Sequence, residues 1–198
     1  MWDQRYAEEG FAYGTEPNAF LQSEYGRIPS GGRVLCLAEG EGRNAVFLAR
    51  QGYLVTAVDQ SSVGLRKALN LAADQGVEIE TVVTDLADYD LGREAWDGIV
   101  SISAHMPPSL RKQLHAQVVL ALKPAGIFIL EAYTPRHLEM AGIGGPSDRS
   151  LMMSLDELRG ELSGLDFLIG QEVERYISEG RYHQGESAVV EIVARKRP

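Results

Sequence analysis

A short glycine turn carries the residues with the clearest chemical potential. In LCLAEGEGRN, residues 35–44, two carboxylates (Glu39 and Glu41) alternate with two glycines (Gly40 and Gly42). The glycines let the backbone approach a ligand closely, and their spacing satisfies the pattern G-x-G-x-x-G/A of dinucleotide sites. Carboxylates at the same turn disfavour a phosphate, because anions gather where backbone N–H groups point. The turn therefore predicts a ligand with a positive amine and no phosphate.

A further carboxylate follows at the end of the next predicted strand. Asp59 lies 17 residues after Gly42. At the carboxyl edge of an open α/β sheet such a residue can accept hydrogen bonds from both ribose hydroxyls of an adenosine. An aspartate just before Ser61 and Ser62 can also cap a helix, so both roles stay open. The same pattern fits an NAD(P)-dependent oxidoreductase, which the neighbouring carboxylates disfavour.

Strands and helices that alternate along the chain must position these residues. The predicted strands are Arg33–Leu37, Tyr53–Val58, Ile79–Val83, Gly98–Ser103 and Gly126–Tyr133, and the predicted helices between them are Asn44–Gln51, Ser62–Gln75 and Ser109–Leu122. This alternation predicts right-handed crossovers and a mostly parallel sheet with helices on both faces, in a Rossmann-like α/β fold.

The last third of the chain departs from that alternation. Ser154–Leu162 is typical of a capped helix, but the β-rich runs Phe167–Ile177 and Ser187–Ala194 have no helix between them. They predict an antiparallel hairpin, with the last strand inserted beside the fifth in a seven-stranded sheet. Thr134–Ser150 is too long for an ordinary connection and is predicted to be a substrate loop.

Several motifs in order resemble one enzyme family. VLCLAEGEGRNAVFLARQGYLVTAVDQS resembles the first two motifs of class I S-adenosylmethionine-dependent methyltransferases, and its GRN…FLA continuation is most similar to the tellurite-resistance and thiopurine methyltransferase-like branch. VVTDLADYDL resembles the family's adenine motif, WDGIVSISAH its fourth strand and LKPAGIFILEAY the segment after it. The resemblance, from about Trp2 to the end of the chain, implies S-adenosylmethionine as cofactor and S-adenosylhomocysteine as product.

The resemblance also implies a cofactor site. Its members are Tyr13, Glu39, Gly40, Gly42, Asn44, Asp59, Gln60, Asp85, Leu86 and Ser101. It assigns Asp59 to the ribose, Asp85 to the adenine amino group and the Leu86 backbone to the adenine ring. The chain departs from the family at Cys36, where an acidic residue is usual. Glu39 is expected to face the ammonium of the ligand instead, or else to be, like Glu41, a solvated turn residue.

Aromatic residues precede the first strand, at Trp2, Tyr6, Phe11 and Tyr13. Such residues usually pack in a core. The resemblance implies that residues 1–30 instead cover the cofactor. Because the sequence has no internal repeat, low-complexity tract or linker, residues 1–198 are predicted to form one domain. An aromatic ring beside a sulfonium also gains cation–π stabilisation.

Methyl transfer needs an acceptor held in line with the activated methyl group and shielded from water. A general base is needed only if the acceptor arrives protonated. His105, in SAHMPP, is the best-placed candidate for that base, and His115 is expected to be a surface or packing residue. The predicted substrate residues are Tyr6, Tyr133, Arg136 and His183. No metal site is predicted.

The composition of the chain limits the classes of molecule expected as methyl acceptor. The formal charge of −9 disfavours nucleic acid and membrane surfaces, which require a basic face. The single cysteine, the lack of a leader-like start and the lack of a long apolar stretch predict a cytoplasmic location. A small metabolite, a thiol or a metalloid fits the acceptor best. A catalytically silent S-adenosylmethionine-binding module is the third alternative, and the sequence does not predict the oligomeric state.

Overall fold

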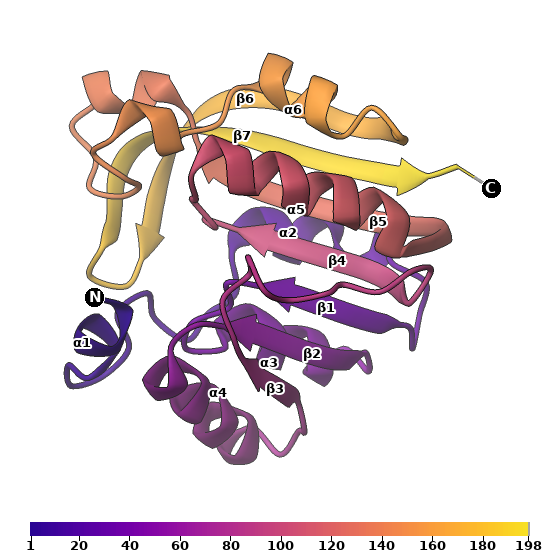
Figure 1. Cartoon of the computed structure of the whole chain (residues 1–198). Coiled ribbons are helices and arrows are strands. Elements are labelled where there is room, and N and C mark those ends of the chain that lie inside the picture. Colours follow the sequence, from indigo (N-terminus) through magenta and orange to yellow (C-terminus); the bar gives the residue numbers. More distant parts are fainter. Residues whose placement is uncertain (198) are drawn as a thin grey trace.

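The computed structural model describes residues 1–197, and its centre is one sheet in the strand order β3-β2-β1-β4-β5-β7-β6 (Figure 1). The strands are β1 (Arg33–Leu37), β2 (Leu54–Asp59), β3 (Glu80–Val83), β4 (Trp96–Ile102), β5 (Leu122–Tyr133), β6 (Leu165–Glu179) and β7 (His183–Lys196). The pairs among β1 to β5 are parallel, whereas β7 runs antiparallel to both β5 and β6. The predicted insertion of the last strand beside the fifth is confirmed.

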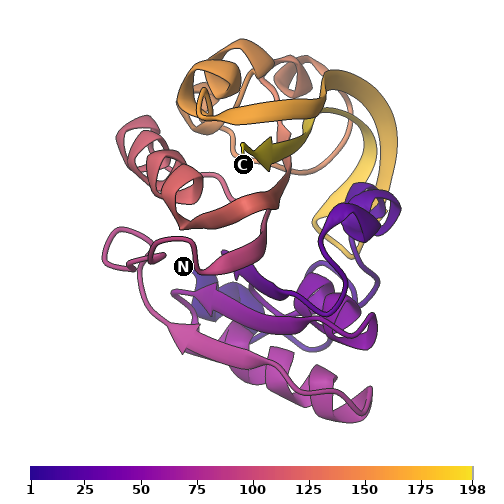
Figure 2. The same cartoon turned by 90° about the vertical axis from the view of Figure 1, so that its right-hand side faces the viewer.

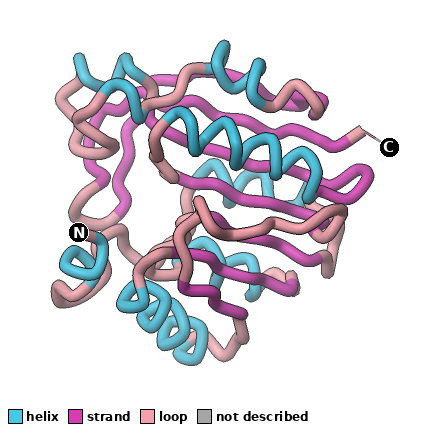
Figure 3. The backbone as a smooth tube through the Cα atoms, viewed as in Figure 1, coloured by secondary structure: helices cyan, strands magenta, loops and turns pink. Residues whose placement is uncertain are grey.

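Helices cover both faces of the sheet (Figure 3). They are α1 (Trp2–Tyr6), α2 (Ala19–Glu24), α3 (Arg43–Arg50), α4 (Ser62–Asp74), α5 (Pro108–Ala121) and α6 (Leu155–Glu161). Single 3-10 turns lie at η1 (Tyr25–Arg27), η2 (Pro135–Glu139) and η3 (Arg149–Leu151). The sequence predicted α3 to α6 to within about one residue, but it did not predict α1 or α2. None of the helices in residues 1–197 combines the length and the apolar character that a bilayer crossing needs.

The core forms two layers because alternate residues of each strand face opposite sides of the sheet. On β1, Leu35 and Leu37 pack in the cluster that includes α5 and α6, and Val34 and Cys36 pack with α2, α3 and α4. Burial on both faces explains the near-continuous apolar runs of the central strands. The parallel pairing of β1 with β2 and β4 places their carboxyl ends at one edge, where open α/β sheets bind ligands.

The hairpin of β6 and β7 is longer than predicted and reaches past that edge. The two strands pair from Leu165↔Lys196 to Glu179↔His183, which leaves a turn of residues 180–182 (Figure 2). There the Arg181 N–H donates to the Ala12 carbonyl at 2.9 Å. The predicted strand ends were wrong here because the outer arms are polar and only partly buried, so they lack the apolar run that marks a core strand.

Gly42 adopts a conformation that side chains disfavour and lies against α4. Its φ is 90°, and a Cβ atom built on it would lie 2.4 Å from the Ala68 Cβ atom. Gly52 has a similar φ of 92° but open space around it. Substitution of Gly52 should therefore cost backbone strain alone, whereas substitution of Gly42 should also disturb close helix packing.

We expect Gly52→Ala to lower the free energy of unfolding by about 1–2 kcal/mol through backbone strain alone. Gly42→Ala should lose about 1–3 kcal/mol more, because the added methyl group overpacks the contact with α4. Urea unfolding monitored by circular dichroism measures both variants. Equal losses would contradict the close packing of α3 on α4.

Candidate active site

A cavity of about 680 Å³ lies at the carboxyl edge of the sheet. Its wall includes ten of the predicted site residues: Tyr6, Tyr13, Glu39, Asn44, Asp59, Gln60, Asp85, Leu86, His105 and His183. Five predicted site residues are not in the wall: Gly40, Gly42, Ser101, Tyr133 and Arg136. The fold thus brings most of the expected set around one space, with residues from the amino-terminal segment, the sheet edge and the hairpin turn.

Asp59 ends β2 with its carboxylate held in place by backbone donors. The Gly40 N–H donates to Oδ2 at 2.9 Å, and the Ser61 N–H donates to Oδ1 at 2.7 Å. Burial raises the pKa of this carboxyl group above its usual value. The cap of α4 is Ser61 rather than Asp59, since the Ser61 hydroxyl accepts from the Gly64 N–H. Asp59 therefore ties the glycine turn to β2 and still faces the cavity.

Glu39 is buried at the amino end of α3, so the expectation of a solvated turn residue is wrong for it. Its Oε1 accepts from the Asn44 N–H at 3.0 Å and from the Ala45 N–H at 2.8 Å. The first N–H groups of a helix have no partner inside the helix, and Glu39 supplies one. Burial raises the pKa of Glu39 to about 7, against the opposing effect of these hydrogen bonds. Glu39 also lines the cavity.

Glu41 is buried as well, and it holds the amino-terminal segment. Its Oε2 accepts from the Ala12 N–H at 2.7 Å, and its Oε1 pairs with Lys67 Nζ at 2.9 Å. The same ammonium donates to the carbonyls of Glu8 and Gly10. The second carboxylate of the glycine turn therefore fastens the segment before β1 to the body of the fold.

The amino-terminal segment covers one side of the cavity. Tyr6 stacks on Trp2, and its hydroxyl group lies so close to Gly40 that a Cβ atom there would be 2.5 Å away. Gly40 has a positive φ of 62°, and the absence of a side chain admits the tyrosine. Arg5 donates to the Tyr13 hydroxyl at 2.9 Å and lies over the Tyr182 ring.

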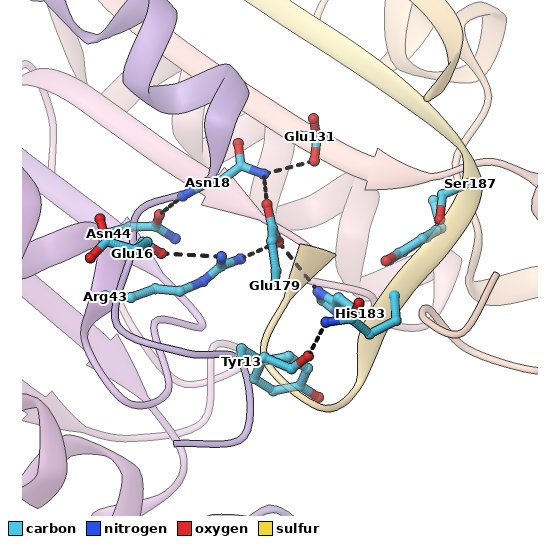
Figure 4. Close-up of polar contacts among 12 residues, drawn as sticks. Tyr13, Glu16, Asn18, Arg43, Asn44, Glu131, Glu179, His183 and Ser187 are labelled. Carbon is cyan, nitrogen blue, oxygen red and sulfur yellow. Dashed lines mark hydrogen bonds and ion pairs between the residues drawn. The ribbon is translucent and has the colours of Figure 1, made fainter. Parts of the chain in front are cut away.

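A buried polar network joins this cover to the sheet and the hairpin (Figure 4). Asn18 donates from Nδ2 to Glu131 at 2.8 Å and to Glu179 at 3.0 Å. Arg43 pairs with Glu179 at 2.7 Å, and Arg175 donates to both oxygens of Glu131 at 2.8 Å. The network links α3, β5, β6 and the start of α2, so it fixes the hairpin relative to the glycine turn.

His105 lies in the cavity wall with both ring nitrogens engaged by the backbone. Nδ1 is 3.0 Å from the Leu151 carbonyl, so it carries the proton, and Nε2 accepts from the Tyr133 N–H at 3.3 Å. Burial lowers the pKa of His105 to about 4. In this arrangement the ring has no free nitrogen for an acceptor. Its catalytic role stays a prediction.

The remaining candidates differ in their surroundings. Tyr133 is buried against His105, His137 and His183, and its hydroxyl group has no hydrogen-bond partner among the described residues. Arg136 is exposed and pairs with Glu139 and Glu174. The described residues offer no group of three His, Cys, Asp or Glu side chains placed to hold a metal ion.

Two further predicted residues have simple environments. Asp85 lines the cavity and accepts from the Ala87 N–H at 2.9 Å. His115 is a buried packing residue rather than a surface one, against Phe128 and 2.7 Å from Glu161.

Several wall residues were missed by the sequence interpretation. They are Arg5, Arg43, Met106, Leu110 and Tyr182, among others. Arg43 stands inside the quoted glycine motif, which is a signal that could have been used. Arg5 and Tyr182 had none, because their contact joins segments distant in sequence.

Comparison with known proteins identifies the architecture. Residues 34–126 match the family model of a methyltransferase domain. A protein of echinomycin biosynthesis, connected with conversion of a disulfide bond into a thioacetal group, has 19% identity and a TM-score of 0.72, with 92% of this chain and 83% of that chain covered. TehB from Haemophilus influenzae has 20% identity and a TM-score of 0.72, with 88% of this chain but only 61% of TehB covered.

A further similar structure is that of a methyltransferase for which the cofactor is also named. An S-adenosylmethionine-dependent methyltransferase from Methanosarcina mazei has 17% identity and a TM-score of 0.67, with 92% of this chain and 99% of that chain covered. No curated protein has a significant sequence match to the chain. At these identities the solved structures establish the fold.

The strand order and the cavity at the carboxyl edge define a class I methyltransferase fold. Residues 34–126 match a methyltransferase domain, and this match agrees with that fold. The comparisons support the predicted family and cofactor, and the oxidoreductase alternative is set aside.

We expect Glu41→Gln to loosen the amino-terminal cover while the sheet stays folded. A neutral amide loses the ion pair with Lys67 and weakens the bond from the Ala12 N–H, which costs about 1–3 kcal/mol. Hydrogen–deuterium exchange should rise in residues 8–14 and stay unchanged in β1 and β4. Glu24→Gln, which removes a surface pair with Arg27 and affects only the local bond from the Ser23 hydroxyl besides, is the control. Unchanged exchange in residues 8–14 would contradict the clamp.

Proposed function

We propose that the chain methylates a small acceptor with an apolar body, bound in the same cavity as the cofactor. The observation that carries the proposal is the composition of the cavity wall. One part presents carboxylates suited to the cofactor, and another part is apolar. The volume of about 680 Å³ is within the range of small-molecule sites.

The wall residues fit S-adenosylmethionine by their chemistry. Asp59 supplies a carboxylate for the ribose hydroxyls, and Asp85 and Leu86 are assigned to contact the adenine. The Glu39 carboxyl group suits the ammonium of the methionine moiety. Arg5 suits its carboxylate, because no carboxylate of the described residues lies within 4.0 Å of this guanidinium. When bound, the cofactor supplies a methyl group activated by a sulfonium.

The rest of the wall suits an acceptor with an apolar body. It includes Met106, Leu110, Ile143, Pro146 and Leu151. Residues 143–148 belong to the predicted substrate loop, which supports its role. Contact with apolar side chains contributes binding free energy without requiring a charge on the acceptor.

The charged side chains of the cavity wall disfavour a metalloid oxyanion as the acceptor. Two arginines line the cavity, and one of them, Arg43, is neutralised by Glu179 at 2.7 Å. The other, Arg5, is assigned to the cofactor, so an oxyanion acceptor would lack a cation. The formal charge of −9 likewise disfavours a nucleic acid. A cytoplasmic location, as the lone cysteine indicates, belongs to the same proposal.

Turnover tests the function. The purified protein is incubated with S-adenosylmethionine and one of four probes: benzenethiol, 4-methylphenol, tellurite or a single-stranded DNA oligonucleotide. We expect S-adenosylhomocysteine to form with at least one of the two apolar probes, and not with tellurite or DNA. Binding of the cofactor without product for any probe would favour the silent module, and product only with tellurite would contradict the apolar acceptor.

Glu39 makes cofactor binding depend on pH. Its pKa of about 7 means that it is protonated below that pH and can then no longer attract the ammonium. S-adenosylmethionine should therefore bind more weakly as the pH falls below about 7, whereas adenosine, which lacks the ammonium, should not share this dependence.

Variants of Glu39 and Asp59 distinguish the roles proposed for these two residues in cofactor binding. Glu39→Gln keeps an oxygen for the N–H groups of α3, and it should weaken S-adenosylmethionine binding roughly ten- to a hundredfold at pH 8 and remove the pH dependence. Asp59→Asn should weaken both ligands. Calorimetry between pH 6 and pH 8 measures these effects. Equal losses for both ligands in Glu39→Gln would show only a distorted turn.

A further inference from the structure

We propose that His183 is the general base that removes a proton from the acceptor, and that Glu179 is the residue that positions it. The inference deepens the proposed function and rests on it. It would make the acceptor a molecule whose nucleophilic atom arrives protonated, such as a hydroxyl group, a thiol or an ammonium.

His183 and Glu179 face each other across the hairpin. They are the last pair of the ladder between β6 and β7, and His183 Nδ1 is 3.5 Å from Glu179 Oε2. The imidazole is only 6% exposed, yet it lines the cavity. At 3.5 Å this contact is an ion-pair distance, and Nδ1 has no hydrogen-bond partner among the described residues. A proton on Nδ1 would face the carboxylate and leave Nε2 for a ligand.

Glu179 is fixed as a carboxylate by other elements. Arg43, from α3, pairs with its Oε2 at 2.7 Å, and Asn18 donates to its Oε1 at 3.0 Å (Figure 4). Burial opposes its ionisation, but the adjacent His183 and the hydrogen-bonded ion pair with Arg43 lower its pKa to about 2. A permanent carboxylate on Nδ1 favours the tautomer with the proton on Nδ1, which leaves a lone pair on Nε2.

The ring is held on its other sides by aromatic side chains. Tyr13 lies 4.4 Å from it between ring centroids, and Tyr133 lies 5.3 Å from it. Burial lowers the pKa of His183, and Glu179 opposes that effect. The other titratable or charged groups that act on it are Arg5, Arg43, Tyr13, Tyr133 and His105. The imidazole is therefore neutral near pH 7, as a base must be.

His105 does not compete for this role in the structure. Its two nitrogens are engaged with the Leu151 carbonyl and the Tyr133 N–H. These are the two histidines in the cavity wall. The geometry therefore leaves one histidine with a nitrogen for the acceptor.

The proton and electrons balance as follows. Nε2 takes the proton from the acceptor atom, whose electron pair forms the new bond to the methyl carbon. The electrons of the broken carbon–sulfur bond stay on sulfur, so the departing thioether is neutral. The imidazolium is stabilised by Glu179 until it releases the proton to water.

Nitrogen chemical shifts test the pair without turnover. In ¹⁵N-labelled protein with S-adenosylhomocysteine, we expect Nδ1 of His183 to carry the proton at pH 8. Glu179→Gln should lower the pKa of His183 by about one unit or more, because it removes an adjacent opposite charge. Glu174→Gln, on the same strand but exposed, should leave it unchanged. A proton on Nε2, or an unchanged pKa in Glu179→Gln, would overturn the pair.

Turnover then tests the base itself. The hydroxyl of 4-methylphenol has a pKa of about 10 and needs a base, as tyrosine would. His183→Asn should slow its methylation roughly 10²- to 10⁴-fold, with a smaller effect on benzenethiol, which is ionised at pH 9. Equal losses for both probes, or none, would overturn the base. If the wild-type protein methylates neither probe, the proposed function fails and the base fails with it, whatever the chemical shifts show.

Discussion

The unsatisfied N–H groups at the start of α3 are the constraint on which the site depends. They belong to buried residues at the carboxyl edge of the sheet, where each N–H group needs an acceptor. Glu39 meets this need from the preceding turn through the Asn44 and Ala45 N–H groups. The turn is fixed again by the bond from Gly40 to Asp59. Glu39, whose carboxyl group stabilises a helix end, thus also lines the cavity.

The two acidic residues of the turn contact different parts of the structure. Glu39 faces the helix and the cavity, whereas Glu41 faces the amino-terminal segment and Lys67. Both are buried because each has specific partners, which offsets the cost of removing a carboxylate from water. This arrangement joins the sheet edge of the cavity to the amino-terminal segment through a single turn of the chain.

The alternation of apolar runs predicted the sheet and four of its helices, because these elements follow from local periodicity. It also predicted that Asp59 and Glu39 would meet at one edge, since parallel strands end there. It did not predict the burial of Glu41, whose partner Ala12 is 29 residues away and offers only a backbone N–H. Nor did it predict the occupied nitrogens of His105, which depend on the positions of Leu151 and Tyr133. Such partners are set by tertiary packing, and no local pattern records them.

The turn between β6 and β7 touches the first residues of the chain. Tyr182 bonds to Glu8 across 174 positions, and Arg181 bonds to the Glu9 carbonyl across 172. Contacts of such large sequence separation carry the highest entropy cost and form late in folding. During synthesis, the glycine turn and the first strands are made well before the hairpin. The cavity therefore gains the wall formed by Tyr182 and His183 only after the chain has been extended past these residues.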